Sequence, residues 1–387
     1  MKVAILGRYP VNGRRVAGGP DAVVSQLASG LQQMADVEVH VVTLSSQVPE
    51  DAFFERDGIW VHSIRPRRLP RWTMLRLNAR ALEQALKAIA PDVVHAHDAG
   101  TYADAALASG YPAVITVHGV IQREAELSRE YGMNWRERLS WAYEERYERH
   151  CLGRAQDVIA ISPYVQDFYQ PFTPAQMHLV ENPVADLFFH LPDRTEPATI
   201  LCAARIIHRK NILTLLQAFA QVHAEFPQAR LRLAGETRSQ PEYAETCRQF
   251  VQTHGLQNAV SFLGWLEQDA IQEEYSKCGC LVLVSWQETA PVSIEQAMSA
   301  GKAVIASDVG GVRYLLVDGQ AGILVDPADV DAQVAAFRRV LTDATLRATL
   351  GKVAREQALN RFHPEVVARR TRAVYETMME RQGSGNH

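Results

Sequence analysis

Glu288 stands in the segment SWQETAPVSIEQAMSAG, residues 285–301, whose residue types suit binding of a polar or anionic ligand. The apolar run 281–284 before it predicts a strand, and the apolar spacing within 294–298 predicts a helix. Strand, turn and helix therefore follow one another here. Ligands of open parallel sheets gather at the carboxyl ends of strands, so we expect this turn to line a binding site.

The residues after Glu288 strengthen this interpretation. Pro291 fits the first turn of a helix and Thr289 can cap it, which places Glu288 just before a helix N-terminus. The free N–H groups there attract anions. A simpler interpretation stays open, in which Glu288 only complements the helix dipole and contributes a few tenths to about 1 kcal/mol.

A second candidate site follows the predicted strand 199–204 in the segment ARIIHRKN. Arg205 and Lys210 are five residues apart around a short turn, and Lys210 precedes a helix that begins near residue 211. Two cations beside a helix N-terminus form an anion site suited to a diphosphate.

Histidines end two predicted strands in the first half of the chain. His118 closes AVITVHG, and His97 closes VVHAH. A histidine at a strand end is most often structural, but His118 would face the ligand crevice of the sheet. His95 and His97 lack a third metal ligand nearby in sequence, so we expect no metal site.

A glycine-bearing loop lies between the predicted strand 3–7 and the helical pattern of 23–31. Gly18 and Gly19 in this loop would let a phosphate approach the backbone. The dinucleotide fingerprint G-x-G-x-x-G is absent, which argues against a dehydrogenase.

These segments belong to two series of alternating strands and helices, which predict two doubly wound α/β domains with parallel sheets. The Pro-rich segment 182–197 is the best linker between them. Predicted strands of the first series are 3–7, 38–44, 60–64, 93–96, 113–118 and 158–161, and those of the second are 199–204, 230–234, 260–263, 279–286, 303–307 and 322–325. Predicted helices of the second series are 212–225, 242–254, 269–277, 291–300 and 330–341.

Length and composition agree with this organisation. A chain of 387 residues with 47% hydrophobic content can form two or three cores. The balance of 40 basic and 44 acidic residues argues against a nucleic-acid partner. Five scattered cysteines form neither a disulfide framework nor a metal spacing, and the N-terminus lacks a signal peptide, so we expect reduced thiols and a cytoplasmic protein.

The segment 65–87 carries seven basic residues and one acidic residue, Glu83, interleaved with apolar residues. It could lie on an anionic membrane surface or meet a phosphate-bearing acceptor, with about 1 kcal/mol for each basic residue near the surface. A solvated helix that ends in arginines explains the pattern equally well.

Taken together, these motifs resemble the retaining glycosyltransferases of family 4, with two Rossmann-like domains in the GT-B arrangement. The likeness covers almost the whole chain. Its carriers are the Gly18–Gly19 loop, ITVHG, AARIIHRKN, LAGE, FLGWL, ETAPVSIEQAM and SDVGGVRYLLVDGQAGILVDP.

The resemblance implies an acceptor-side domain over 1–186, onto which a C-terminal helix 365–382 returns, and a donor-binding domain over 187–364. It implies a metal-independent, retaining hexosyltransferase of EC 2.4 type with a nucleotide-sugar donor and no cofactor. The acceptor would be a glycan, a lipid-linked glycan or a small molecule.

The resemblance also assigns roles to single residues. Arg205 and Lys210 would bind the diphosphate, and Glu288 and His118 would contact the sugar. The remaining donor-binding residues would be Gly18, Gly19, Leu266, Thr289, Ala290, Pro291, Val292 and Gln296. The departing phosphate is expected to help deprotonate the acceptor, and the D-x-D sequence at Asp329 is interpreted as a helix cap.

One position departs from the family pattern. The family has E-x7-E, whereas this chain has Glu288 followed by Gln296. Glu295 is one residue early and would point about 100° away on a helix. The family's second glutamate binds ribose hydroxyls, and a glutamine carbonyl can accept the same bonds without the charge-assisted strength.

Two other functions stay open. An epimerase or hydrolase could bind the same donor, and so could a non-catalytic sugar-nucleotide module. The joint presence of His118, Arg205, Lys210 and Glu288 argues against a decayed, non-catalytic site.

Overall fold

The computed structural model describes residues 1–11, 19–47, 50–67, 71–132 and 134–384. The chain divides into two compact units. Unit 1 comprises residues 1–184 and 363–387, and unit 2 comprises residues 185–362. The sequence places the divisions after 186 and after 364.

Unit 1 is built on an eight-stranded sheet, as far as its described residues show. Its strand order is β3-β4-β2-β1-β5-β6-β7-β8, and every pair is parallel except β3 with β4. The strands are β1 (Lys2–Leu6), β2 (Glu38–Leu44), β3 (Ala52–Arg56), β4 (Ile59–Ile64), β5 (Val93–His97), β6 (Ala113–Val117), β7 (Asp157–Ala160) and β8 (Gln176–Leu179). The order reverses between β1 and β5, which marks the ligand-binding point of such sheets.

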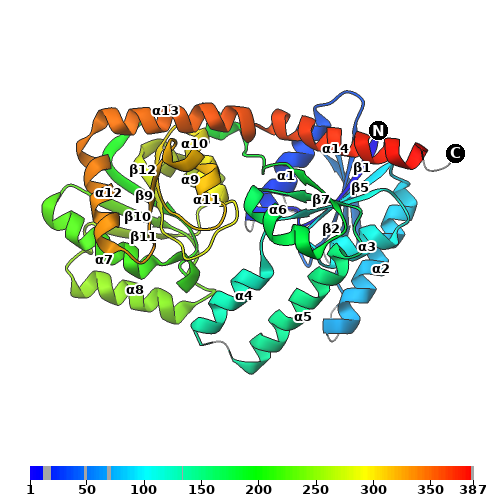
Figure 1. Cartoon of the computed structure of the whole chain (residues 1–387), viewed down its shortest axis with the longest axis horizontal. Coiled ribbons are helices and arrows are strands. Elements are labelled where there is room, and N and C mark those ends of the chain that lie inside the picture. The colour runs from blue at the N-terminus through cyan, green and yellow to red at the C-terminus, as the bar shows by residue number, and fades with distance from the viewer. Residues whose placement is uncertain (12–18, 48–49, 68–70, 133, 385–387) are drawn as a thin grey trace. The chain divides into compact units, whose positions relative to one another are not determined.

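Helices cover both faces of this sheet (Figure 1). Val3, Ile5, Val39, Val41 and Val61 face the core against the first and last helices of the unit. The helices are α1 (Gly19–Gln32), α2 (Arg71–Ile89), α3 (Thr101–Ala108), α4 (Ile121–Glu130), α5 (Trp135–Leu152), α6 (Pro163–Tyr169), the short η1 (Gln170–Phe172) and α14 (Pro364–Ser384).

Helix α14, drawn in red in Figure 1, lies beside α1 in unit 1. Val367, Ala368 and Tyr375 from this helix join the buried core of the sheet. Gly30 of α1 approaches the carbonyl of Pro364 so closely that an added Cβ would lie 2.9 Å from it. Helix α14 is therefore an integral part of unit 1.

Strand β3 was not predicted from the sequence. It pairs antiparallel with β4 across a two-residue turn at Asp57 and Gly58, both with positive φ. Asp-Gly is typical of such a hairpin turn, but the strands predicted from apolar runs do not include β3. Phe53 in β3 is 61% exposed, because an edge strand buries little of its outer surface.

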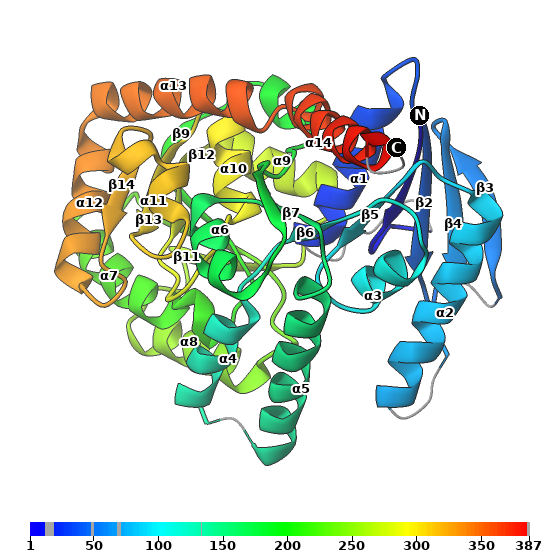
Figure 2. The ribbon, with the colours of Figure 1, turned by 45° about the vertical axis from the view of Figure 1, so that its right-hand side comes forward.

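Helix α2 occupies most of the basic segment 65–87. In Figure 2 it lies beside β4, and its residues Leu82 and Leu86 are fully buried. This part of the helix therefore packs in unit 1 and leaves its charges in solvent. Residues 68–70 lie outside the described residues, and membrane contact stays a prediction for the part before Ala79. No helix among the described residues is long and apolar enough to cross a membrane.

Unit 2 contains a second sheet, six-stranded and wholly parallel within the described chain. Its order is β11-β10-β9-β12-β13-β14. The strands are β9 (Glu196–Ala203), β10 (Arg230–Ala234), β11 (Val260–Gly264), β12 (Cys278–Leu283), β13 (Ala303–Ser307) and β14 (Ile323–Val325). The predicted class, two α/β domains with parallel sheets, is confirmed.

The helices of unit 2 alternate with these strands. They are η2 (Asp186–His190), η3 (His208–Lys210), α7 (Ile212–Glu225), α8 (Pro241–Thr253), α9 (Gln268–Lys277), α10 (Val292–Ser299), α11 (Val312–Leu315), η4 (Val317–Gly319), α12 (Val330–Thr342) and α13 (Ala344–Arg361). Helix α13 was not predicted.

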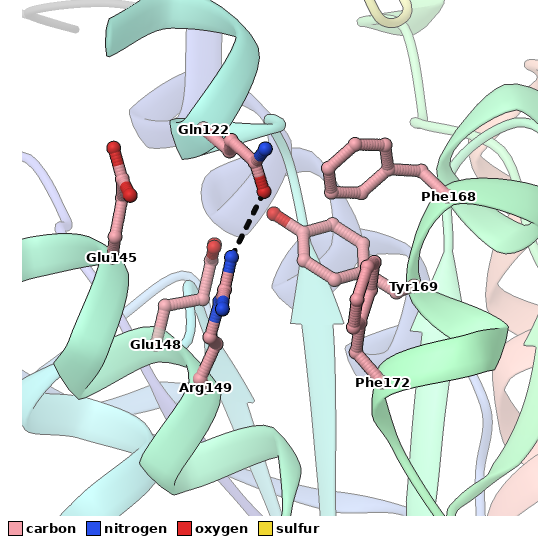
Figure 3. Close-up of a pocket in the computed structure, with 7 residues that line it drawn as sticks. All are labelled: Gln122, Glu145, Glu148, Arg149, Phe168, Tyr169 and Phe172. Carbon is pink, nitrogen blue, oxygen red and sulfur yellow. Dashed lines mark hydrogen bonds between the residues drawn. The ribbon is translucent and has the colours of Figure 1, made fainter.

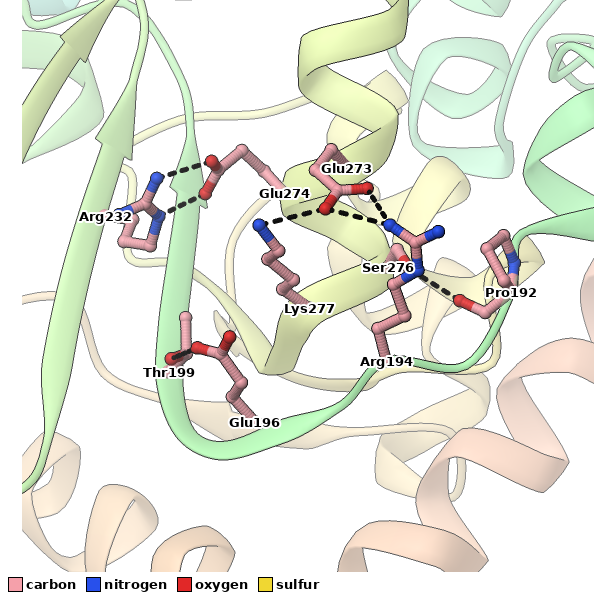
Figure 4. Close-up of polar contacts among 9 residues, drawn as sticks. All are labelled: Pro192, Arg194, Glu196, Thr199, Arg232, Glu273, Glu274, Ser276 and Lys277. Carbon is pink, nitrogen blue, oxygen red and sulfur yellow. Dashed lines mark hydrogen bonds and ion pairs between the residues drawn. The ribbon is translucent and has the colours of Figure 1, made fainter.

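Ion pairs join α9 to neighbouring segments at the amino ends of the unit 2 strands (Figure 4). Arg232 of β10 forms a bidentate ion pair with Glu274, which is 7% exposed. Glu273 binds Arg194 at 3.0 Å and Lys277 at 2.9 Å at the surface. This network fixes the end of the sheet opposite the candidate site.

Candidate active site

The unit 2 sheet reverses its strand order between β9 and β12. Strands β10 and β11 extend the sheet on one side of this point, and β13 and β14 extend it on the other. The loop after β9 carries Arg205 and Lys210, and the loop after β12 carries Glu288. The fold thus brings two candidate segments, about eighty residues apart, to the position where open sheets bind ligands.

The two loops meet through charged side chains. The Lys210 ammonium forms an ion pair with Oε1 of Glu288. Arg209 lies 3.7 Å from Oε2 of the same carboxylate. The side chains of Lys210 and Glu288 are only 12% and 6% exposed, so this charge cluster is largely shielded from water.

Burial and neighbouring charges shift the pKa values of this cluster. Burial lowers the pKa of Lys210, and the positive charges of Arg209 and Arg205 also lower it. The negative charge of Glu288 acts in the opposite direction but does not outweigh them. For Glu288, burial alone would raise the pKa, but Lys210 and Arg209 outweigh it, so the pKa is lowered. Glu288 is therefore ionised at neutral pH beside an excess of positive charge.

Backbone hydrogen bonds fix the loop that carries Glu288. The N–H of Trp286 donates to the carbonyl of Arg209 at 2.9 Å, and the N–H of Gly311 donates to the carbonyl of Glu288 at 3.2 Å. Strand β12 ends at Leu283, so the strand predicted to run to residue 286 is too long. The last three residues belong instead to the loop that forms these contacts.

Helix α10 begins two residues later than a cap at Thr289 requires. Pro291 is its N-cap, the first helical residue is Val292, and no side chain caps the helix. The prediction that Thr289 caps the helix with Pro291 in its first turn is wrong, because Pro291 keeps an extended backbone. Thr289, Ala290, Pro291 and Val292 nevertheless form the segment that joins Glu288 to this helix.

Arg205 is the second residue after β9 and is exposed. Gly235, from the motif LAGE, lies against its loop: an added Cβ would stand 1.8 Å from the carbonyl oxygen of Ala204. The N–H of Ile206 donates to the carbonyl of Glu236 at 3.0 Å. A residue without a side chain is needed at position 235 because the loops after β9 and β10 touch here.

The other donor-binding candidates of unit 2 lie around this edge. Leu266 is half-buried and follows β11 at the same carboxyl edge of the sheet. Gln296 lies on α10, where its Oε1 accepts a hydrogen bond of 3.1 Å from the Tyr275 hydroxyl. Its side-chain carbonyl retains a second lone pair for a ligand.

In unit 1, the imidazole rings of three histidines from β5 and the end of β6 stack on one another. The ring of His95 lies 4.5 Å from that of His97, and the ring of His97 lies 5.1 Å from that of His118. Nδ1 of His97 and Nε2 of His118 are 2.8 Å apart and share a hydrogen bond. His118 itself follows the last residue of β6 and is half-buried.

These imidazoles are neutral at physiological pH. Burial lowers the pKa of His95 to about 3 and lowers that of His97 well below its usual range. Burial also lowers the pKa of His118, although Asp98 and Asn182 act in the opposite direction. A neutral His118 is suited to hydrogen bonding with a hydroxyl group and not to neutralising a phosphate.

The predicted phosphate loop of unit 1 is only partly covered by the structure. Gly19 is the first residue of α1, whereas Gly18 lies outside the described residues. The described chain contains no group of three or more His, Cys, Asp or Glu placed to hold a metal ion. Asp329 caps α12 by accepting a 2.8 Å bond from the N–H of Ala332, which confirms the interpretation of the D-x-D sequence.

Two family models match consecutive parts of this chain. Residues 17–186 match the model described as Glycosyltransferase Family 4. Residues 184–357 match the model described as Glycosyl transferases group 1. The chain is a family 4, group 1 glycosyltransferase. The family expected from the motifs is therefore confirmed.

Relatives of this glycosyltransferase extend over its whole length. It is 26% identical to the alpha-maltose-1-phosphate synthase of Mycolicibacterium smegmatis, over 97% of this chain and 99% of that protein. The solved sucrose-phosphate synthase of Thermosynechococcus elongatus superimposes with a TM-score of 0.81 at 22% identity, over 98% and 99% of the two chains. Anabaena HepE in complex with UDP and glucose superimposes with a TM-score of 0.72 at 19% identity, over 97% and 100%. These neighbours show the GT-B fold.

Sequence reasoning on this glycosyltransferase missed Arg209. The side chain contacts Glu288 and also donates to the backbone carbonyl of Gln287 at 3.1 Å. Its position beside Lys210 in HRKN is visible in the sequence, but the sequence analysis assigns it no role. Only the proximity of the loops after β9 and β12 shows that Arg209 belongs to the candidate site.

Proposed function

We propose that this glycosyltransferase transfers a sugar from a nucleotide-diphosphate sugar, with retention of the anomeric configuration and without a metal ion. The observation that carries the proposal is the shielded cluster of Lys210, Arg209 and Glu288 at the switch point of the unit 2 sheet. Relatives support the donor class, since HepE binds UDP and glucose in its solved complex.

The cations of unit 2 match the charge that such a reaction develops. When the glycosidic bond breaks, negative charge builds on the departing diphosphate. Lys210 and Arg205 are assigned to its oxygens, and Arg209 adds a third positive charge beside them. Preorganised charge of this kind is often the largest catalytic term, with one donor group contributing about 3 to 4 kcal/mol.

Glu288 is assigned to hydroxyl groups of the transferred sugar. An ionised carboxylate accepts hydrogen bonds from hydroxyls, and the ion pair with Lys210 would hold it next to the diphosphate. Backbone N–H groups of 289–292 are assigned to sugar and phosphate, and the backbone of Leu266 is assigned to the base. In unit 1, His118 is assigned to a sugar hydroxyl and the Gly18–Gly19 loop to a phosphate.

In this proposal the leaving group accounts for retention of the anomeric configuration. The departing phosphate takes the proton of the acceptor hydroxyl on the same face of the sugar, so no enzyme nucleophile is required. With the diphosphate neutralised by arginine and lysine, no metal ion is needed. Turnover that is unchanged by EDTA would support metal independence, and turnover restored only by added Mg²⁺ would contradict it.

The acceptor is proposed to be a glycan, a lipid-linked glycan or a small molecule, in glycan or polysaccharide biosynthesis. The maltose-1-phosphate synthase relative supports a role in glucan-related chemistry. We propose a cytoplasmic location, where nucleotide sugars are made. Epimerisation or hydrolysis of the donor, and binding without turnover, are the outcomes that the following experiment separates.

Thermal unfolding with UDP, GDP and ADP identifies the donor base first, because a ligand at 100 times its dissociation constant adds about 2.7 kcal/mol of stability. The matching nucleotide sugars are then supplied with and without candidate acceptors. Acceptor-dependent release of nucleoside diphosphate supports transfer. Release without acceptor indicates hydrolysis, an altered sugar without release indicates epimerisation, and stabilisation without turnover indicates a binding module.

Gln296 is predicted to contact the donor ribose. Replacing it by alanine should weaken donor binding about fivefold, the effect of one hydrogen bond. Replacing it by glutamate should change the affinity by more than twofold, because the bond becomes charge-assisted. Affinity is measured by calorimetry with the selected nucleotide. Tyr275→Phe is the control, since it removes the protein partner of Gln296 and leaves the amide in place. Affinities within twofold for both Gln296 variants would place this side chain away from the ribose.

A further inference from the structure

Arg209 is held in the candidate site by the residue that precedes Glu288. Its Nη1 donates to the backbone carbonyl of Gln287 at 3.1 Å and to Oε1 of the same residue at 3.3 Å. The same nitrogen lies 3.7 Å from Oε2 of Glu288, beyond hydrogen-bond distance. A guanidinium Nη carries two N–H bonds, so Gln287 accepts both of them. The contact between Arg209 and Glu288 is therefore electrostatic, and Gln287 sets its geometry.

The side-chain amide of Gln287 has only one favourable orientation beside Arg209. A guanidinium has donors and no acceptors, so the amide oxygen must face it and the amide N–H₂ must turn away. Gln287 is 8% exposed, and its Nε2 is buried without a hydrogen-bond partner among the described residues. A buried donor without a partner lowers stability. Stability alone therefore does not explain an amide at this position.

An arginine–glutamine pair in unit 1 shows the arrangement that stability alone favours. In the small hollow lined by α4, α5 and α6, Arg149 donates to Oε1 of Gln122 at 3.0 Å (Figure 3). The Nε2 of Gln122 in turn donates to Glu126 at 3.0 Å, so both ends of this amide are satisfied. Gln287 makes the first kind of bond and lacks the second.

A glutamate at position 287 would bind Arg209 more strongly, because a carboxylate accepts charge-assisted hydrogen bonds and has no N–H to bury. It would also change the charge of the site. Lys210 and Arg209 carry two positive charges, and Glu288 carries one negative charge. A second carboxylate would cancel the remaining positive charge. The neutral amide instead orients Arg209 and leaves that charge in place.

We propose that Gln287 is a positioning residue whose neutral amide fixes the Arg209 guanidinium beside Glu288 and preserves the positive charge that a diphosphate requires. This role rests on the proposed function, which assigns the cluster to the diphosphate of the donor. It has two separable consequences. The orientation of Arg209 governs turnover, and the neutrality of residue 287 governs the affinity for an anion.

Gln287→Glu tests neutrality, because it keeps the acceptor and adds one negative charge. Its affinity for inorganic pyrophosphate, measured by calorimetry at neutral pH, should be about tenfold lower than that of the parent, the effect of a hydrogen bond to a charged group. Gln228→Glu is the matched control. Gln228 is exposed in the loop before β10, at the end of the sheet opposite the candidate site, so this variant should bind within twofold of the parent. Equal affinity of Gln287→Glu and the parent would overturn the proposal.

Gln287→Met tests orientation, because it keeps the length and the charge of the side chain and removes only the acceptor. Its kcat for transfer should fall about fivefold, while its pyrophosphate affinity stays within twofold of the parent value. Gln228→Met should match the parent in both measurements. Parental kcat in Gln287→Met would overturn the proposal. Equal losses of kcat and pyrophosphate affinity would also overturn it, because they indicate general damage to the loop.

A double-mutant cycle on stability needs no substrate. Gln287→Met, Arg209→Met and the double variant are compared with the parent by chemical denaturation. If Gln287 holds Arg209, the effects of the two single substitutions on the unfolding equilibrium constant should exceed that of the double variant by about fivefold when multiplied. Independent effects would show that the two side chains do not interact and would overturn the proposal. This result is separable from failure of the proposed function, which a parent protein that binds no pyrophosphate would show.

Discussion

Lys210→Met should lower glycosyl transfer by a factor of about 10² to 10³, as loss of one preorganised charge donor does. Methionine keeps the apolar stem of lysine and removes only the ammonium that pairs with Glu288. The departing diphosphate would then lose the most shielded positive charge of the site. The measurement is acceptor-dependent release of nucleoside diphosphate at saturating donor, compared with the parent protein.

Lys277→Met is the control for this experiment. Lys277 is on α9, its side chain is 37% exposed, and it pairs with Glu273 one helical turn earlier. An exposed pair of this kind contributes about 0 to 1 kcal/mol, so transfer should be unchanged. Lys210→Met retains Arg209 beside Glu288, which limits the stability lost and allows the assay to be run on folded protein. A Lys210→Met enzyme that keeps more than a tenth of the parental turnover would show that Lys210 does not stabilise the transition state.

The sequence predicted which loops of unit 2 carry the candidate residues. Arg205, Lys210 and Glu288 each follow a strongly apolar strand, and consecutive parallel strands place their carboxyl ends on one edge of a sheet. That argument does not determine which strands are neighbours. The adjacency of β9 and β12, which brings Lys210 to Glu288, depends on long-range packing. The contact of Arg209 with Glu288 depends on the same adjacency, so the sequence alone could not predict it.

The missed elements have other causes. Strand β8 is absent from the predicted strands because it is short and lacks an apolar alternation. The cap at Thr289 was predicted from residue preference, but Pro291 stays extended and is itself the N-cap, two residues later.

Glu288→Ala should both stop transfer and destabilise unit 2. Removing the carboxylate leaves Lys210 and Arg209 beside each other, shielded from water and without their counter-charge. Loss of one partner from a buried ion pair costs about 3 to 5 kcal/mol. Chemical denaturation monitored by circular dichroism measures this loss. Glu273→Ala is the matched control, because it removes a surface carboxylate and should cost about 1 kcal/mol or less.

The pH dependence of Glu288→Gln tests the same charge balance. The folded pKa of Glu288 is lowered, so its stabilising effect is complete above the unfolded value near 4.5 and is lost as the pH falls below it. The stability difference between the parent and Glu288→Gln should therefore shrink on acidification below about pH 4.5. Diphosphate should stabilise Glu288→Gln more than the parent, because an anion can replace the missing carboxylate between the two cations. Equal stabilisation of both proteins by diphosphate would mean that Lys210 and Arg209 do not form the anion site. Removing the negative charge of Glu288 would then leave the affinity for diphosphate unchanged.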